Sequence, residues 1–177
     1  MKNLFVFVEG KEDMLFVKKV LYNLFIEHLI KIIPIPYQET KNHEVKKLIK
    51  TAKADHDYVL LSDLDRHTYP CITSRKNKRI DELDGEITSD KIIIVVEELE
   101  SWCLAGIDTT IDEYTDFVIP ESTDDITKED FDKILSNTSF NKNKLFNYLS
   151  FNFSVDLAIE RNKSFKYFMK KYCIFSF

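Results

Sequence analysis

Four short apolar runs lie within the first part of the chain, and each predicts a buried strand. They occupy residues 4–8, 30–35, 58–61 and 92–96. Between them, apolar residues recur at every third or fourth position, as at Met14, Val17 and Leu21, which is the spacing of an amphipathic helix. Strands that alternate with helices in this way predict a parallel sheet covered by helices. Pro34 and Pro36 indicate that the second strand lies at an edge, because proline cannot donate to a central ladder.

The pattern changes towards the end of the chain, where helical spacing dominates. Residues 97–105 have helical spacing, and Gly106 is a suitable C-cap. Thr127 and Asp130 then form the pattern of a capping box. Three short segments with aromatic inner faces follow, at residues 144–151, 155–159 and 165–172. We therefore expect the C-terminal part to be small and mainly helical.

Together these patterns predict an α/β protein with a mostly parallel four-stranded sheet flanked by helices. We expect residues 1–107 to form this core and residues 108–177 to form a helical extension packed on it. The segment between the third and fourth strands, as far as Glu86, is polar and basic, and no element is assigned to it.

The composition narrows the class of protein. A chain of 177 residues, 44% of them hydrophobic, is long enough for one domain with a small appendage. A net charge of −5 disfavours a protein that simply coats DNA, which would be basic. Cys71, Cys103 and Cys173 have neither disulfide nor zinc spacing, so we expect reduced thiols and a cytoplasmic protein. Since no apolar stretch approaches the roughly 18 residues of a membrane span, we expect no membrane association.

Carboxylates follow three of the four predicted strands. They are Glu9 after the first strand, Asp63 and Asp65 after the third, and Glu97, Glu98 and Glu100 after the fourth. Open parallel sheets bind ligands at the carboxyl ends of their strands, and carboxylates gathered there repel one another. A divalent cation would offset that repulsion, and Mg²⁺ prefers oxygen ligands. The sequence therefore predicts a metal site, although an Asp-x-Asp pair alone is equally typical of a turn or a helix cap.

Other polar residues near these strand ends are candidates for binding phosphate. Gly10 suits a tight turn with a positive φ angle, and it would let a phosphate approach the following helix. His67 could contact a phosphate or act as a base. The basic side chains that could meet a nucleic-acid backbone are Arg66, Arg75, Lys76, Lys78 and Arg79. The competing interpretation of this basic run is a solvated face of the protein.

Three segments resemble motifs of the Toprim family. Val8-Glu9-Gly10, with Asp13 four residues after Glu9, is similar to the first Toprim motif, and residues 60–66 are similar to the second, which ends a strand with Asp-x-Asp. Residues 96–105, which include Glu100-Ser101-Trp102, resemble a signature of small, stand-alone OLD-like Toprim proteins of uncharacterised function. Residues 161–168 resemble the C-terminal end of the same proteins.

The resemblance implies a Toprim/Rossmann-like fold and a phosphodiester chemistry that depends on Mg²⁺ or Mn²⁺. The chain would then be a nuclease that cleaves DNA or RNA, in phage defence or nucleic-acid processing. Glu9 would transfer a proton or bind metal, and Asp63 and Asp65 would bind an ion. Asp13, with Glu97 or Glu100, would complete a second metal site.

Two other functions compete with this interpretation. A Toprim fold could act without turnover, as a sensor or as a partner subunit in a defence complex. Phosphatases of the haloacid dehalogenase type also use Asp-x-Asp, but they place it after the first strand, whereas here it follows the third. The presence of acids at all the motif positions favours the nuclease over the sensor. Topoisomerase activity is disfavoured, because no tyrosine lies in a topoisomerase-like context.

Overall fold

The computed structural model describes residues 2–66 and 68–172. His67 and Cys173, which were considered in the sequence, lie outside the described residues. The chain packs as two compact units, Met1–Val95 and Val96–Phe177. The first holds all four strands, and the second begins directly after the last of them. The domain boundary expected after residue 107 stays a prediction.

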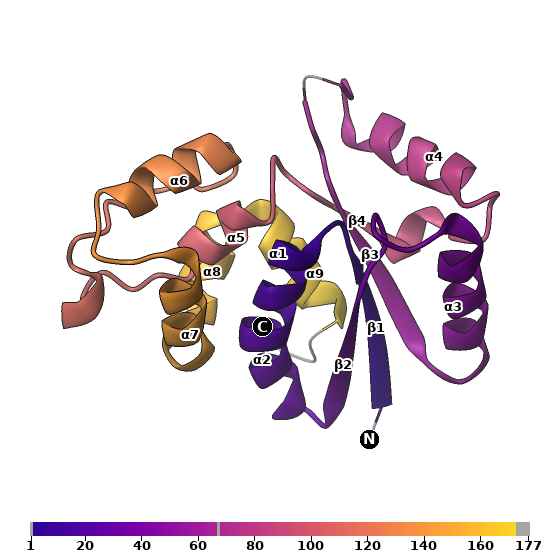
Figure 1. Cartoon of the computed structure of the whole chain (residues 1–177), viewed down its shortest axis with the longest axis horizontal. Helices are drawn as coiled ribbons and strands as arrows, with labels where there is room; N and C mark the ends of the chain where they lie inside the picture. Colours follow the sequence, from indigo (N-terminus) through magenta and orange to yellow (C-terminus); the bar gives the residue numbers. More distant parts are fainter. Residues whose placement is uncertain (1, 67, 173–177) are drawn as a thin grey trace. The chain divides into compact units, whose positions relative to one another are not determined.

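The first unit is built on a four-stranded sheet whose strands are all parallel (Figure 1). The strands are β1 (Lys2–Val8), β2 (Ile30–Pro36), β3 (Asp57–Asp63) and β4 (Ile92–Val95), in the order β2-β1-β3-β4. The central strands are apolar on both faces: Val6 and Phe7 of β1 and Val59 and Leu60 of β3 are all 0% exposed. The prediction of a parallel sheet flanked by helices is confirmed, and the proline-containing β2 lies at an edge.

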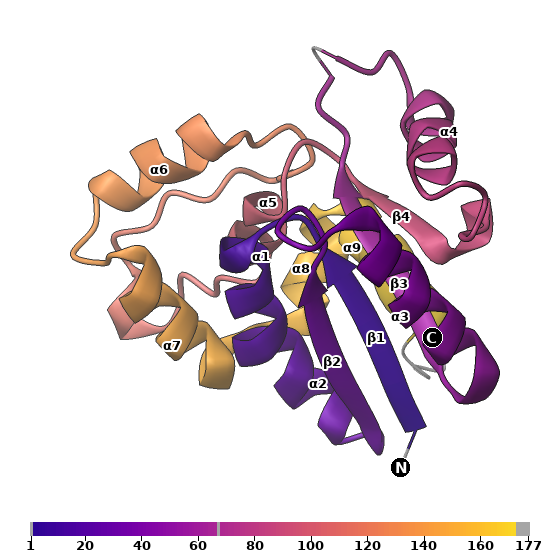
Figure 2. The same cartoon turned by 45° about the vertical axis from the view of Figure 1, so that its right-hand side comes forward.

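Helices cover both faces of this sheet (Figures 1 and 2). On one side lies a continuous helical segment made of α1 (Lys11–Phe16), the π-helical turn η1 (Val17–Leu21) and α2 (Tyr22–Ile26). On the other side lie α3 (Asn42–Asp55) and α4 (Ile72–Glu82), and a short 3₁₀ turn, η2 (Ser89–Lys91), precedes β4. Val45, Ile49 and Ala52 of α3 pack in the apolar cluster of that face.

Helix α4 lies in the polar, basic segment to which the sequence analysis assigned no element. Its buried residues are two arginines, Arg75 and Arg79, whereas its apolar residue Ile72 is 46% exposed. Only near its end do apolar side chains join the core, through Ile80 and Leu83. Because hydrophobic periodicity counts arginine as polar, it could not detect this helix.

The regular elements of the second unit, over its described residues, are all helices, as expected of a mainly helical C-terminal part. It contains α5 (Glu100–Ala105), the 3₁₀ turn η3 (Asp112–Tyr114), α6 (Lys128–Ser136), α7 (Lys142–Asn152), α8 (Val155–Arg161) and α9 (Lys163–Tyr172). Trp102 is fully buried, with its ring centroid 5.3 Å from Phe165 and 5.2 Å from Phe168. The capping box of Thr127 and Asp130 is present at the start of α6. No helix in the described part of the chain is long and apolar enough to cross a membrane.

A buried polar network holds α5 and α9 together. The Asn162 amide donates to Ser101 Oγ at 3.2 Å and to Thr123 Oγ1 at 3.0 Å, while its oxygen accepts from Ser164 Oγ at 2.8 Å. Ser164 Oγ in turn accepts from Trp102 Nε1 at 2.7 Å. The two segments that resembled OLD-like proteins therefore meet here, and these side chains satisfy one another inside the second unit.

Candidate active site

The carboxyl ends of β1 and β3, which are neighbours in the sheet, bring two predicted site residues together. Glu9 directly follows β1, and Ser62 and Asp63 end β3. The backbone N–H of Asp63 donates to Glu9 Oε1 at 3.2 Å, and Ser62 Oγ donates to the same oxygen at 3.0 Å. Since ligands of open parallel sheets bind at these ends, this is the expected position for a site.

Glu9 accepts an unusually large number of hydrogen bonds. Its Oε1 atom receives the two bonds from β3, one from the Tyr37 hydroxyl at 2.9 Å, and one each from Arg75 Nη2 at 2.9 Å and Arg79 Nη2 at 2.7 Å. Its other oxygen, Oε2, accepts from the Gln38 amide at 2.7 Å, on the more exposed side. The Glu9 side chain is 15% exposed. One carboxylate oxygen is therefore held inside the unit, and the other is turned outwards.

The two arginines bind β3 as well as Glu9. Arg75 Nε donates to the backbone oxygen of Asp63 at 2.7 Å, and Arg79 Nε donates to Ser62 Oγ at 3.0 Å. The guanidinium carbon of Arg75 lies 4.5 Å from the centre of the Tyr69 ring. That of Arg79 lies 4.9 Å from the centre of the Tyr37 ring. These contacts fix the plane of each guanidinium group beside Glu9.

Glu9 is an anion in this environment. Burial alone would raise the pKa of its carboxyl group, but the positive charge of Arg79, the hydrogen bond from Tyr37 and the charge of Arg75 together lower that pKa below its ordinary value. Burial and the neighbouring Glu9 carboxylate raise the pKa of Tyr37 well above 10.0. A carboxylate with a lowered pKa is a poor proton acceptor at neutral pH, so this arrangement suits a fixed negative charge better than a general base.

Two acids predicted for this site, Asp65 and Asp13, occupy different settings. Asp65 is exposed and has a φ angle of 49°, in the left-handed region that aspartate tolerates better than most residues. Its backbone oxygen accepts from the N–H groups of Thr68 and Tyr69, both at 2.9 Å. The Asp13 carboxylate accepts from the backbone N–H of Gly10 at 3.0 Å, at the start of α1.

The expectation that Gly10 adopts a positive φ angle is wrong. Its φ is −132° and its ψ −173°, which is extended backbone open to any residue. The left-handed conformations at strand ends fall instead on Asp65, after β3, and on Glu97, with φ of 59°, after β4. Leu29, just before β2, and Asp84, in the turn after α4, adopt the same region, so it is not confined to the acids predicted for the site.

The remaining predicted metal ligands, Glu97 and Glu100, belong to the second unit, so their place in one site with Asp63 stays a prediction. Glu100 is 8% exposed and lies 3.9 Å from Lys142 Nζ. Burial, and then the negative charge of Glu100, raise the pKa of Glu98. In the described part of the chain, the buried Oε2 atom of Glu98 has no hydrogen-bond partner.

These side chains suit a divalent cation in part. Asp63 is half-buried and Asp65 exposed at the end of β3, and their carboxylates are hard oxygen donors of the kind that Mg²⁺ and Mn²⁺ bind. The orphaned oxygen of Glu98, with its raised pKa, is also an atom that a cation would satisfy. Over residues 2–66 and 68–172, however, no group of three or more His, Cys, Asp or Glu side chains is already arranged to hold a metal ion.

The predicted nucleic-acid contacts divide into exposed and buried side chains. Arg66 and Lys78 are exposed, and Lys76 Nζ donates to the backbone oxygen of Ser89 at 2.8 Å. Arg75 and Arg79 are 7% and 9% exposed, because they turn inwards to Glu9. No contact with nucleic acid is tested for any of the five, so that role stays a prediction.

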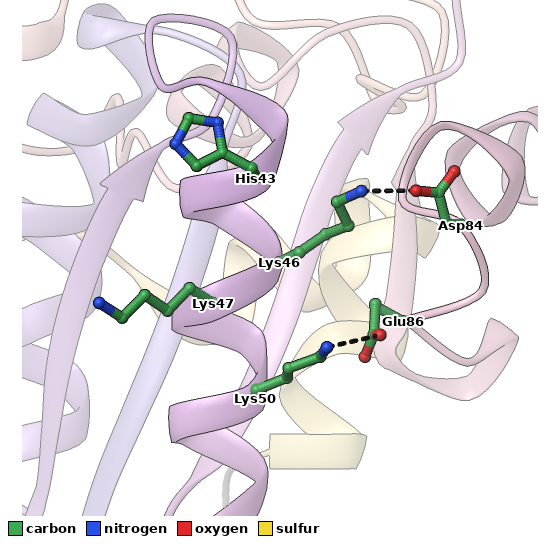
Figure 3. A pocket seen from close by; sticks show the side chains of 6 residues that line it. All are labelled: His43, Lys46, Lys47, Lys50, Asp84 and Glu86. Atoms are coloured by element: carbon green, nitrogen blue, oxygen red, sulfur yellow. Dashed lines mark hydrogen bonds and ion pairs between the residues drawn. The ribbon is translucent and has the colours of Figure 1, made fainter.

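A separate hollow of about 380 Å³ lies between α3 and the turn after α4 (Figure 3). Lys46 and Lys50 line it, and they form ion pairs with Asp84 and Glu86. The Lys47 side chain points away from these acids in Figure 3. The Lys46 and Lys50 charges that line the hollow are thus paired within the unit, and they give no reason to expect an anionic ligand there.

Three residues of the Glu9 cluster were not foreseen from the sequence: Tyr37, Gln38 and Ser62. None of the three is a carboxylate, and no carboxylate directly follows the second strand. The signal that could have found them is the parallel register of β1 and β2, in which Val8 pairs with Pro36. The residues that follow each strand, Glu9 and Tyr37, are then opposite each other.

The fold and this cluster define the protein as an α/β protein with a parallel sheet of the Toprim/Rossmann-like kind and a buried, arginine-paired glutamate at its carboxyl edge. No family model matches the chain, and no curated protein matches it. In structure it is similar to the C-terminal region of the Burkholderia pseudomallei OLD protein, with a TM-score of 0.50 over 95% of this chain and 97% of that one. The sequence identity is 17%, so the likeness shows an OLD-like fold alone.

Proposed function

We propose that this protein is a nuclease that hydrolyses phosphodiester bonds of DNA or RNA with the help of Mg²⁺ or Mn²⁺. The observation that supports the proposal most is the meeting of Glu9 and the Ser62–Asp63 end of β3 at the carboxyl edge of a parallel sheet. Asp65 follows within two residues of that end. The structural likeness to the C-terminal region of an OLD protein adds support for the same fold.

In the proposed site, Asp63 and Asp65 hold a divalent ion through their carboxylate oxygens. Glu9 contributes a negative charge of fixed position beside the end of β3, and its outward oxygen, to which Gln38 donates, is the one on the side of a ligand. A bound ion of this kind supplies charge neutralisation at the scissile phosphate and lowers the pKa of a coordinated water. The second ion that the sequence resemblance implies, with Asp13 and Glu97 or Glu100 as ligands, stays a prediction.

Substrate binding in this proposal depends on basic side chains near the site. Arg66 follows Asp65 directly and is exposed, and Lys76 and Lys78 lie on α4. Contacts of this type with phosphates would make binding weaken as salt concentration rises.

The test is a cleavage assay with purified protein, single- and double-stranded DNA and RNA, and Mg²⁺ or Mn²⁺ against a chelator control. We expect cleavage of at least one substrate, which the chelator abolishes. Asp63→Asn, which removes the negative charge of one proposed metal ligand, should be inactive with the same substrate. Cleavage by Asp63→Asn at the wild-type rate would contradict the proposal.

One observation favours a second function, that of a non-catalytic sensor or partner subunit, such as one in a phage-defence complex. Five donors, two of them arginines, already occupy Glu9 Oε1 and neutralise its charge, as in a purely structural ion pair. A wild-type protein that binds nucleic acid but cuts nothing with either metal would support this second function.

A further inference from the structure

We infer that Arg75 and Arg79 are positioning residues of the proposed metal site, which hold Glu9 and the end of β3 in one fixed arrangement. This inference rests on the proposed function, because it assigns the two arginines a task within that same site. It differs from the prediction drawn from sequence, in which both arginines contact a nucleic-acid backbone.

The first support is that each guanidinium group bridges two parts of the site. Arg75 joins Glu9 Oε1, at 2.9 Å, to the backbone oxygen of Asp63, at 2.7 Å. Arg79 joins the same Glu9 oxygen, at 2.7 Å, to Ser62 Oγ, at 3.0 Å. Both arginines therefore tie the residue after β1 to the last residues of β3, where the proposed ligand Asp63 lies.

A second support is the orientation that these bonds impose on Glu9. With both guanidinium groups on Oε1, the carboxylate cannot turn over without breaking two charged hydrogen bonds. Oε2 is thereby kept on the more exposed side, where Gln38 donates to it. The Tyr69 and Tyr37 rings lie against the two guanidinium groups and restrict their movement in turn.

The burial of the two side chains argues against a direct role in binding phosphate. The Arg75 and Arg79 side chains are 8% and 11% exposed, and their Nε and Nη2 atoms are directed to partners within the unit. A backbone phosphate needs cationic N–H groups that face solvent, and on α4 the ammonium group of Lys78, 52% exposed and 3.7 Å from Glu82, is closer to that situation.

The experiment compares Arg75→Gln and Arg79→Gln with a charge-matched control, Lys47→Gln on the exposed face of α3. Three quantities are measured for each protein: Mn²⁺ affinity by electron paramagnetic resonance, DNA affinity at several salt concentrations, and kcat and KM for the cleaved substrate. We expect each arginine variant to lose about 10- to 100-fold in Mn²⁺ affinity or kcat, the usual cost of removing a group that orients a metal ligand. DNA affinity, its salt dependence and KM should match those of the control.

Two results with the glutamine variants would overturn the inference. One is a loss of DNA affinity with a shallower salt dependence while Mn²⁺ affinity stays at the wild-type value, which is the behaviour of a phosphate contact. The other is Mn²⁺ affinity and kcat that both equal those of Lys47→Gln. A wild-type protein that binds no Mn²⁺ would also overturn it, whereas one that binds Mn²⁺ but cleaves nothing overturns the nuclease proposal alone.

Arg75→Lys and Arg79→Lys cover the case in which the glutamine variants do not fold. Lysine keeps the positive charge but cannot bind both Glu9 and β3 as the planar guanidinium does. We expect these variants to fold and to show a smaller, intermediate loss of Mn²⁺ affinity. Full wild-type affinity in both lysine variants would contradict positioning through two contacts.

Discussion

Replacing Glu9 by glutamine should destabilise the protein, because buried Arg75 loses the carboxylate that it pairs with and buried Arg79 keeps only the more exposed Glu82. The variant keeps the size of the side chain and a neutral oxygen that can still accept hydrogen bonds. Arg75 and Arg79 are 7% and 9% exposed, so water cannot readily solvate the charges that remain. The perturbation is thus confined to the electrostatics of one cluster.

The magnitude follows from the two charged hydrogen bonds. A hydrogen bond to a charged group contributes about 1.5–3 kcal/mol and a neutral one about 0.5–1.5, so each arginine loses about 1 to 1.5 kcal/mol. The two together give about 2–3 kcal/mol, somewhat below the roughly 3–5 kcal/mol expected when one partner of a buried pair is removed outright. At about 2–4 °C per kcal/mol for a chain of this size, Tm should fall by about 4 to 12 °C.

Urea and thermal unfolding measure this loss, with Glu27→Gln as a control at an exposed glutamate. The pH dependence gives a second signature. Since the folded state lowers the pKa of Glu9 below its ordinary 4.5, its contribution to stability is complete above about that pH and is lost as the pH falls through the folded-state value. The gap between wild type and Glu9→Gln should therefore close in acid. A Glu9→Gln protein within about 0.5 kcal/mol of wild type at pH 7 would refute the reasoning, since that is the scatter of neutral surface changes.

Three further substitutions test other parts of the account. Asp63→Asn should abolish metal-dependent cleavage. Without metal its thermal stability should be unchanged or higher, because Asp63 bonds to Glu9 and Arg75 through its backbone. A large drop in Tm would indicate that the Asp63 side chain has a structural role. Gly106→Ala should cost about 1–3 kcal/mol, since its Cβ would overlap the Phe153 ring, and that cost should shrink in combination with Phe153→Ala. Asn162→Ala should lower the free energy of unfolding, measured in urea, by about 3 kcal/mol, because several buried hydroxyl groups lose a partner at about 1–3 kcal/mol each. A stability equal to that of the wild type would contradict the importance of this hydrogen-bond network.

The sheet could be predicted from the sequence because its strands are buried on both faces and therefore read as continuous apolar runs. Helix α4 could not, because the residues that it buries are charged. Arg75 and Arg79 are four positions apart, which places them on one helix face, but a pair of arginines is typical of an exposed face. Glu9 and the end of β3 give that face its buried partners.

The structure brings together two of the predicted acids, Glu9 and Asp63, but their roles as site residues stay predictions, and the contacts that surround them were not predicted. Glu9 and Asp63 meet as the strand order requires, since β1 and β3 are neighbours in the sheet. The Tyr37 contact depends on the register of β2, and the arginine contacts depend on a helix without an apolar signal. Neither is encoded in the local spacing of residues, which is the information that the sequence patterns carry.

Residues 96–105 and 161–168, which resemble OLD-like proteins in sequence, contact each other inside the second unit. Trp102 and Ser101 bond to Ser164 and Asn162, so these side chains serve the packing of the second unit. Glu100 differs from them, because it is a buried acid beside another acid of raised pKa, Glu98. In the second unit, Glu98 and Glu100 are therefore the side chains that we expect first to bind a cation.

The most direct test of the metal site is a crystal structure of the protein soaked in Mn²⁺, with the ion located by anomalous scattering. We expect an ion bound by carboxylate oxygens of Asp63 or Asp65, on the side of the outward oxygen of Glu9. An ion bound elsewhere, or Asp63 and Asp65 side chains that point into separate environments away from Glu9 in the presence of Mn²⁺, would contradict it.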